Sequence, residues 1–424
     1  MMGENNNKSF FTYSDIMQMF KNTLKTIDER LVCHGDRVAY IIYEIVKEGN
    51  LYKKFDYRKL MLLAEFHDVG SYRTDEIDRI MSIHNTNVFD HSIYGYVFLK
   101  NMTFLNEYAE TVLFHHLKYK DLIFSSTKYK DYAALIYFAD RVDIILHKKG
   151  SSYDFSYLKK FVPDVFCPEY VELFLRANEK RNIVKRIDNN EYLKDMQSAY
   201  DKVKIPHKDA EEFLKMIIYI IDFRSRCTVT HTVKTSYISL QLAKLLKMSD
   251  EMQQEVFYGA FLHDIGKIAI PTRILESPGK LNEEEMKIMS THVDFTEKIL
   301  RGVISNKICN IAVRHHEKLD GSGYPNHLTD KDLTMQEKVV AVADIVSALS
   351  DQRSYKTAFP KEETIEIIKK MDAEGKLSPK VCSVLVDNYD EIMKDTQEHS
   401  RATLELYNTI TLEYKRLKEN FFWM

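Results

Sequence analysis

Ten of the fifteen histidines fall into two ordered series that also contain aspartates. The first series consists of His34, His67, Asp68, His91, His115, His116 and Asp140. The second consists of His231, His263, Asp264, His292, His315, His316 and Asp344. Imidazoles and a carboxylate that bridges two cations are the donors of a two-metal site that activates water. Such a site suits hydrolysis of a phosphate ester, because the cations neutralise the charge that develops on the phosphoryl group.

The two series repeat each other along the chain. Their corresponding members are separated by 197, 196, 201, 200 and 204 residues. The flanking sequence agrees, since HGDRVAYI at 34–41 matches HTVKTSYI at 231–238. This self-similarity indicates an internal duplication. We therefore predict two domains, at 1–205 and 206–424.

Any one of these histidines, taken alone, is more often an ordinary core residue that is satisfied by a hydrogen bond. Two ordered sets of seven residues favour metal binding instead. Imidazole and carboxylate ligands without thiolates favour iron or manganese over a structural zinc ion. We expect two divalent ions in the second domain.

The elements that must position these residues are expected to be helices. Glycine and proline are scarce, with 13 and 8 residues, so turns should be few. Apolar residues recur at intervals of three and four, as in helices packed on one face, at 36–48, 57–68, 236–248, 251–266 and 283–301. The prediction is an all-α protein with two tandem helical domains.

Composition excludes several classes of function. The 60 basic and 63 acidic residues nearly cancel, so no overall field recruits polymeric nucleic acid or an anionic membrane. The five cysteines are too scattered for a disulfide framework or a paired-cysteine zinc site. The start of the chain has no signal-peptide pattern, and the apolar runs are shorter than the ~20 residues that cross a bilayer. We expect a cytoplasmic protein that contacts no membrane.

The second series lies in sequence that resembles the HD-GYP group of the HD superfamily of metal-dependent phosphohydrolases. The segments that carry the resemblance are LHDIGKIAIP at 262–271, HHEKLDGSGYP at 315–325 and VADIVSALSDQRSYK at 342–356. Residues 30–200 resemble a more divergent HD domain that lacks the Gly-Tyr-Pro loop. The resemblance implies hydrolysis of a cyclic dinucleotide, chiefly cyclic di-GMP, to the linear dinucleotide or GMP. Cyclic GMP-AMP is the alternative substrate.

The resemblance also implies which residues hold each ion. His231, His263, Asp264 and Asp344 would bind one ion. Asp264, His292, His315 and His316 would bind the other, so that Asp264 bridges the two. Some members of the family hold a third ion through a glutamate, but Cys227 occupies that position here, which favours two ions.

Four residues are expected to contact substrate. Lys267 follows Asp264 by three residues, so on one helix the two would share a face, and Lys267 could hold the scissile phosphate. Asp264 and Lys267 are therefore the expected catalytic residues. Tyr324, in the turn DGSGYP, is expected to stack on a base or to donate its hydroxyl. Arg353 and Lys356 match family positions that contact substrate phosphate. One departure is Ser347, where the family usually has aspartate.

The first domain keeps all seven ligand residues but has Ser71 where Lys267 would match. We expect a second metal site there and a regulatory or structural role. The stretch 387–422 reads as one or two amphipathic helices that either pack onto the body or pair two subunits in a homodimer. Two other functions stay open, namely a phosphohydrolase of mononucleotides and a nucleotide- or metal-sensing scaffold without turnover.

Overall fold

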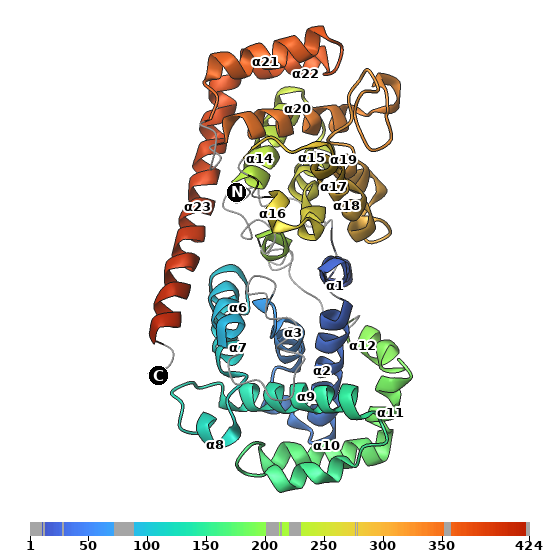
Figure 1. Cartoon of the computed structure of the whole chain (residues 1–424), viewed down its shortest axis with the longest axis vertical. Helices are drawn as coiled ribbons and strands as arrows, with labels where there is room; N and C mark the ends of the chain where they lie inside the picture. Colours follow the sequence, from blue (N-terminus) through green and yellow to red (C-terminus); the bar gives the residue numbers. More distant parts are fainter. Residues whose placement is uncertain are drawn as a thin grey trace. The chain divides into compact units, whose positions relative to one another are not determined.

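The computed structural model describes residues 11, 13–27, 29–71, 89–200, 212, 214–219, 230–275, 277, 279–351 and 358–420. Within these ranges the regular elements are α-helices and short 3-10 helices, and β-structure is limited to two isolated bridges (Figure 1). The predicted all-α class is confirmed. The chain forms two compact units. Unit 1 comprises Met1–Ile16, Asp28–Phe213 and Ile410–Met424, and unit 2 comprises Met17–Ile27 and Leu214–Thr409.

Unit 1 is built around helix α2 (Glu29–Glu48), which packs against α3 (Tyr57–Phe66), α9 (Lys130–Lys149) and α10 (Pro168–Arg181). Helix α9 buries apolar side chains on almost every turn, from Tyr132 to Leu146. The remaining helices of this unit are α6 (Phe89–Met102), α7 (Glu110–Phe114), α8 (Tyr119–Leu122), α11 (Ile183–Asp188) and α12 (Tyr192–Tyr200).

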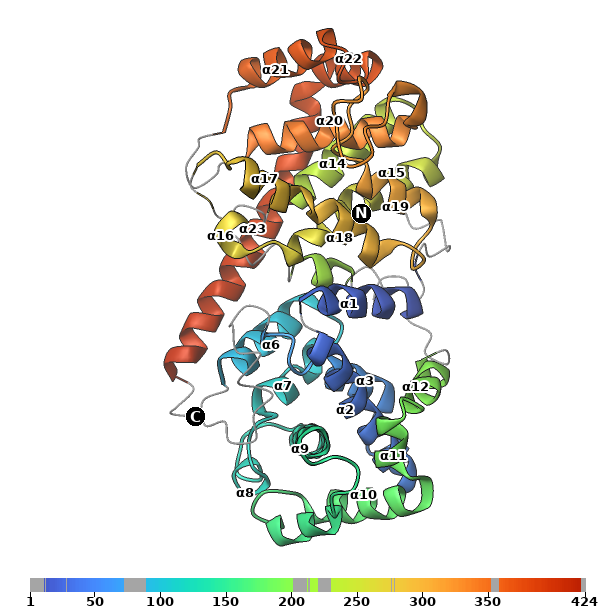
Figure 2. The same ribbon diagram turned by 45° about the vertical axis from the view of Figure 1, so that its right-hand side comes forward.

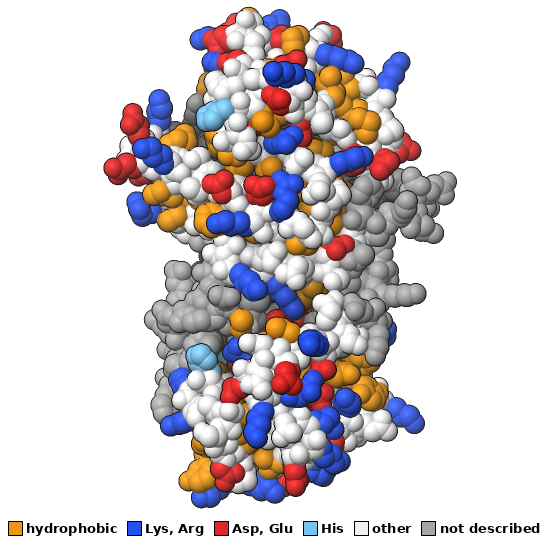
Figure 3. Space-filling model, turned by 90° about the vertical axis from the view of Figure 1, so that its right-hand side faces the viewer, with side chains coloured by type: hydrophobic (Ala, Val, Ile, Leu, Met, Phe, Trp, Pro, Cys, Tyr) orange, Lys and Arg blue, Asp and Glu red, His pale blue; other side chains and the backbone are white. Residues whose placement is uncertain are grey.

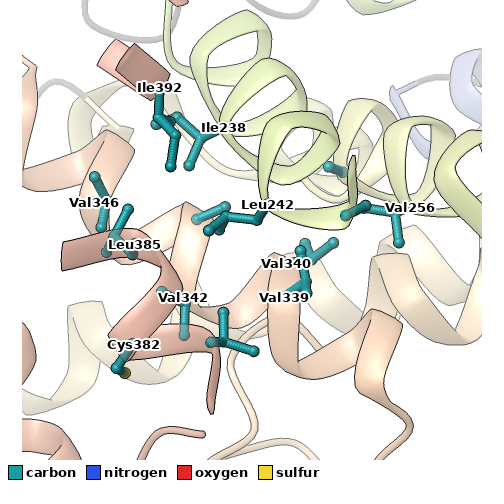
Figure 4. Packing of buried hydrophobic residues seen from close by; sticks show 14 of the residues in the cluster. Ile238, Leu242, Val256, Val339, Val340, Val342, Val346, Cys382, Leu385 and Ile392 are labelled. Carbon is teal, nitrogen blue, oxygen red and sulfur yellow. The ribbon is translucent and has the colours of Figure 1, made fainter. Parts of the chain in front are cut away.

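Unit 2 is built around α14 (His231–Leu245), which packs against α15 (Asp250–Leu262) and α20 (Met335–Ser350). Figure 4 shows the side chains at this junction, where Leu242 of α14 meets Val339 and Val342 of α20. Helix α19 (Asn306–Val313) packs against α15, and α18 (His292–Leu300) packs against α19 and the 3-10 helix η4 (Ile265–Ala269) (Figure 2). The other helices are α16 (Thr272–Leu275), α17 (Glu283–Ser290), α21 (Lys361–Ala373) and α22 (Pro379–Asp387).

Two expectations about single helices need comment. The segment 283–301 is not one continuous helix, because the helix is interrupted at Thr291, between α17 and α18. The C-terminal stretch forms one long helix, α23 (Tyr389–Asn420). Helix α23 is divided between the units at Thr409, and α1 (Tyr13–Ile27) is divided at Ile16.

The surface agrees with the balanced composition. On the face drawn in Figure 3, basic and acidic side chains are interspersed and neither sign dominates. Among the described helices, none is both long and apolar enough to cross a membrane.

Candidate functional site

The seven ligand residues predicted in unit 2 come from five helices and meet at one place. They lie at the first residue of α14 (His231), directly after α15 (His263 and Asp264), at the first residue of α18 (His292), after α19 (His315 and His316) and inside α20 (Asp344). Most of these positions are helix ends, where the chain can turn a side chain toward a common centre. The histidines and Asp264 form two groups whose potential ligand atoms lie within 4.8 Å of one another in each group.

Asp264 occupies the centre of this arrangement. Its Oδ2 atom lies 3.1 Å from Nε2 of His263 and 3.6 Å from Nε2 of His231. Its Oδ1 atom lies 3.5 Å from Nε2 of His292 and 4.0 Å from Nε2 of His315. The two oxygens therefore face two different pairs of imidazoles. A carboxylate that bridges two cations needs this orientation.

Asp344 completes the centre from the side of α20. Its Oδ1 atom lies 3.1 Å from Nε2 of His231 and 3.6 Å from Nε2 of His263. Its Oδ2 atom lies 3.5 Å from Nδ1 of His316. Asp344 thus lies against His231 and His263 through one oxygen and against His316 through the other.

The backbone fixes which nitrogen of each imidazole faces the centre. In His263, His292 and His315, Nδ1 lies 2.6 Å from the carbonyl oxygen of the residue three positions earlier. A carbonyl oxygen only accepts hydrogen bonds, so Nδ1 must carry the hydrogen. The lone pair of Nε2 is then left for a cation. Metal-binding histidines are commonly oriented by a partner of this kind.

The protonation states also suit metal ligands. Burial lowers the pKa of His292 to about 4 and that of His316 to about 3, so both are neutral near pH 7. Burial alone would raise the pKa of Asp264, but His263 and Lys267 lower it well below its ordinary value. Asp264 is therefore ionised, and its buried Oδ1 has no hydrogen-bond partner in the described parts of the chain. Burial also opposes a charged His231, but Asp344 and Asp351 outweigh it and raise the pKa of His231 to about 9. Neutral His292 and His316 beside an unsatisfied carboxylate fit divalent cations, and a cation bound at His231 would displace its proton.

Lys267 lies at this centre, but it belongs to a different type of helix from the one expected. It does not continue α15, which ends at Leu262, but lies in the 3-10 helix η4 (Ile265–Ala269). A tight turn still brings its ammonium group onto the Asp264 carboxylate, with which it forms an ion pair. The side chain is mostly buried, so its positive charge lies directly beside this cluster of imidazoles and carboxylates.

The turn into η4 depends on a residue with no side chain. A Cβ atom on Gly266 would lie 1.9 Å from the carbonyl oxygen of His292. The backbone N–H of Gly266 donates to Thr296 Oγ1 (3.0 Å), and that hydroxyl donates to the carbonyl oxygen of His263 (3.1 Å). The Thr296 hydroxyl on α18 is thus bonded to the backbone of both His263 and Gly266. This link fixes the position of His263, after α15, relative to His292 on α18.

The Gly-Tyr-Pro loop covers one side of the centre. The ring of Tyr324 lies 4.7 Å from the ring of His316. Glu317, only 1% exposed, anchors the loop by accepting hydrogen bonds from the N–H groups of Asn326 (2.7 Å) and Leu328 (3.0 Å). The sequence interpretation missed Glu317, although an acid directly after two ligand histidines was a usable signal. The expected substrate contacts Arg353 and Lys356 lie outside the described residues.

Unit 1 brings its own seven residues together in the same pattern. Asp68 Oδ2 lies 3.3 Å from Nε2 of His67 and 3.8 Å from Nε2 of His34. Asp68 Oδ1 lies 3.3 Å from Nε2 of His91 and 3.5 Å from Nε2 of His115. The two oxygens again face two pairs of imidazoles. The remaining members, His116 and Asp140, belong to the two groups of potential ligands found here.

The two centres differ in the cations beside them. Ser71, at the position that matches Lys267, brings no positive charge. Instead, the guanidinium group of Arg141 binds Asp140 Oδ2 at 2.7 and 3.1 Å. The residue that matches Arg141 in unit 2 is Ile345. Among the described residues of unit 1, Arg141 thus pairs with Asp140, whereas in unit 2 Lys267 pairs with the central Asp264.

Fold and site together define a class of protein: a tandem of helical domains, each with histidine and aspartate side chains around a bridging carboxylate. Two family models, both described as HD domains, match residues 31–145 and 215–381. The chain belongs to the HD family and carries two copies of the domain. The resemblance inferred from the motifs is thereby confirmed.

Several known proteins are similar to this chain. The 3'3'-cGAMP-specific phosphodiesterase 1 of Vibrio cholerae is 27% identical over 84% of this chain and 86% of its own length. A cyclic di-GMP phosphodiesterase of Thermotoga maritima is 35% identical over 50% of this chain and 60% of its own length. A solved cyclic GMP-AMP specific phosphodiesterase of Vibrio cholerae has a TM-score of 0.55 at 16% identity, covering 90% of this chain and 98% of its own. This last likeness shows the fold alone.

Proposed function

We propose that the second HD domain is a metal-dependent phosphodiesterase that hydrolyses a cyclic dinucleotide to the linear dinucleotide, mononucleotides or both. The observation that carries the proposal is the position of Asp264, which turns one oxygen to each of two imidazole pairs. The proposed metal ligands are His231, His263, Asp264, His292, His315, His316 and Asp344. Iron or manganese suits this set of donors.

The chemistry divides between the ions and the chain. Two divalent ions held by these residues would supply Lewis-acid activation of a water and would neutralise charge on the phosphoryl group. Asp264 holds the two halves of the ligand set together. Lys267, whose ammonium group contacts Asp264, places a further positive charge where the phosphoryl oxygens become more negative. Tyr324, against His316, offers a ring for stacking and a hydroxyl for a hydrogen bond.

Arg353 and Lys356 remain proposed contacts for the second phosphate of the ring. A cyclic dinucleotide carries two phosphodiester anions, and Lys267 can neutralise only the one that is cleaved. Guanidinium and ammonium groups are the side chains best suited to hold the other phosphate. This role rests on the resemblance of 342–356 to the family sequence.

Two substrates deserve direct comparison. The sequence motifs favour cyclic di-GMP, and the relative from Thermotoga maritima bears that activity in its name. That relative matches only half of this chain, whereas the 3'3'-cGAMP-specific relative matches 84% of it, across both HD domains. The length of this match supports 3'3'-cGAMP as a second candidate substrate.

Unit 1 is proposed to bind two ions through His34, His67, Asp68, His91, His115, His116 and Asp140, and to regulate or steady unit 2. Four histidines of unit 1 contact Asp68 in the same way as their counterparts in unit 2 contact Asp264, namely His34, His67, His91 and His115. It lacks the lysine at the bridging aspartate and the Gly-Tyr-Pro loop. We also propose that the protein acts in the cytoplasm, where cyclic dinucleotides serve as messengers, and that it forms a homodimer. Light scattering tests the oligomeric state.

The test compares Asp264→Ala with Asp68→Ala in the full chain purified without oxygen and supplied with iron or manganese. Hydrolysis of cyclic di-GMP and 3'3'-cGAMP is followed by chromatography, with nucleoside triphosphates as a third substrate. We expect Asp264→Ala to abolish product and Asp68→Ala to retain most of it. Undiminished turnover by Asp264→Ala refutes the site. Cleavage of triphosphates alone supports a mononucleotide hydrolase, and tight binding without product supports a sensor.

A further inference from the structure

A buried carboxylate lies behind the first ligand histidine of each unit, on the side away from the centre. In unit 1 this carboxylate is Asp143, three residues after Asp140. Its Oδ2 atom lies 2.7 Å from Nδ1 of His34, which therefore donates a hydrogen bond to it. Arg37 binds the same carboxylate at 2.5 and 2.8 Å. His34 is thus oriented by one aspartate that an arginine holds in place.

Unit 2 has no carboxylate at the matching position. Three residues after Asp344 stands Ser347. Its hydroxyl lies 3.0 Å from Nδ1 of His231 and 3.2 Å from the carbonyl oxygen of the same residue. The hydroxyl donates to the carbonyl and can accept from Nδ1–H. This arrangement fixes the ring but places no negative charge behind it.

The missing charge is supplied by Asp351, one helical turn beyond Ser347. Asp351 is buried, with a side chain only 5% exposed, and its Oδ2 lies 3.6 Å from Nδ1 of His231. That oxygen has no hydrogen-bond partner in the described regions of the chain. The other oxygen, Oδ1, is held by Lys234 and accepts from Thr230 Oγ1 at 3.3 Å.

Comparison of the two repeats shows that the carboxylate has shifted along the chain while the cation has kept its position. Lys234 follows its ligand histidine by three residues, as Arg37 follows His34. The unit 1 residue that matches Asp351 is His147, which is exposed. Each unit therefore has one histidine, one buried carboxylate and one cation, but the carboxylate comes from different turns of the matching helices.

We propose that Asp351 is a positioning residue for the metal centre of unit 2, taking over together with Ser347 the role that Asp143 has alone in unit 1. The Ser347 hydroxyl accepts the Nδ1 hydrogen and fixes the ring, and the Asp351 carboxylate makes the imidazole a stronger donor at Nε2. Carboxylates behind ligand histidines have this effect on metal sites in general. Lys234 keeps the carboxylate ionised and at the right place. The inference rests on the metal-dependent function proposed above.

The test measures metal affinity of the full chain by competition of Mn²⁺ with a fluorescent chelator, without substrate. We expect Asp351→Asn, which keeps the side-chain shape, to weaken binding of the ion that His231 would hold by about 10-fold to 100-fold. Asp390→Asn is the matched control. Asp390 also pairs with a lysine, Lys361, but its side chain is 79% exposed and far less buried than Asp351. It should leave the affinity unchanged.

A rescue variant separates positioning from simple loss of packing. Asp351→Ser should weaken binding as Asp351→Asn does, and the double variant Ser347→Asp with Asp351→Ser should restore it by reproducing the arrangement of unit 1. Circular dichroism checks that each variant folds. Unchanged affinity in Asp351→Asn, or a double variant as weak as Asp351→Ser, overturns the inference. Failure of the proposed hydrolysis would instead appear as a wild-type chain that binds metal and yields no product.

Discussion

Replacing Gly266 by alanine should damage the proposed catalytic centre without touching a ligand. The new Cβ would lie 1.9 Å from the carbonyl oxygen of His292, whereas ordinary contacts begin at 3.4 Å. Helices η4 and α18 must therefore separate by about 1.5 Å, since the two shortest contacts of the new atom, with the carbonyl oxygen of His292 (1.9 Å) and the backbone nitrogen of Thr296 (2.5 Å), are both with backbone. This movement pulls Asp264 away from His292. Because a misplacement of about 1 Å can cost 10²-fold in rate, we expect a loss of at least about 100-fold in kcat.

The chain offers a matched variant in the other unit. A Cβ on Gly70 would lie 2.0 Å from the carbonyl oxygen of His91, which is the counterpart of His292. Gly70→Ala should therefore disturb the centre of unit 1 by the same amount and leave most hydrolysis intact. Gly279→Ala is the control, because nothing lies within 4 Å of its added atom.

The assay combines three measurements on each variant: product formation from cyclic dinucleotides, metal content by mass spectrometry and thermal unfolding. We expect Gly266→Ala to lose activity and metal while the fold persists, at a cost of about 1–3 kcal/mol in the free energy of unfolding. Full activity with an unchanged metal content in Gly266→Ala would refute the reasoning. Equal losses of activity in Gly266→Ala and Gly70→Ala would show that both centres are needed for turnover.

Three further predictions concern the same unit. Lys267→Met should lower kcat by about 10²–10³-fold while metal content persists, because only charge stabilisation of the phosphoryl group is lost; steady-state kinetics and metal analysis decide this. Glu317→Gln replaces one of two acceptor oxygens by a donor, so one loop N–H is left unsatisfied, and thermal unfolding should show a loss of about 1–3 kcal/mol. Burial raises the pKa of Cys382 to about 12, so near pH 8 the thiol stays protonated; peptide mapping after alkylation should find it protected until the chain unfolds.

The two clusters of histidine and aspartate were predictable because residue type and spacing carried the information. Carboxylates and imidazoles that recur in the same order at nearly constant distances could be matched without knowing any contact. The helical class followed from apolar periodicity and scarce glycine and proline. The pairing of Lys267 with Asp264 was also expected from their separation by three residues, and a 3-10 turn produces it as well as an α-helix would.

Other parts of the site depend on contacts between residues far apart in the sequence, which no local sequence pattern encodes. Asp351 faces His231 only because α14 and α20 pack side by side, and 120 residues of sequence separate the two. Glu317 acts through two backbone N–H groups nine and eleven residues later, which depends on the path of the loop. The break at Thr291 was hidden because apolar spacing continues across it. It matters for function, since it makes His292 the first residue of a helix.

The contacts within unit 1 explain why a domain without Lys267 can still keep a full set of ligands. Buried atoms of His34, His67, Asp68, His115 and Asp140 have no hydrogen-bond partner among the described residues. Each such atom costs about 1–3 kcal/mol, and a typical domain has only about 5–15 kcal/mol of stability in total. Protons relieve part of this cost: burial opposes a charged His34, but Asp140 and Asp143 outweigh it and raise its pKa to about 10. Protonation cannot offset the cost at His115, because burial lowers the pKa of that imidazole. Cations would satisfy all of these atoms at once, so the metal binding proposed for unit 1 would stabilise its fold and would require no catalytic role.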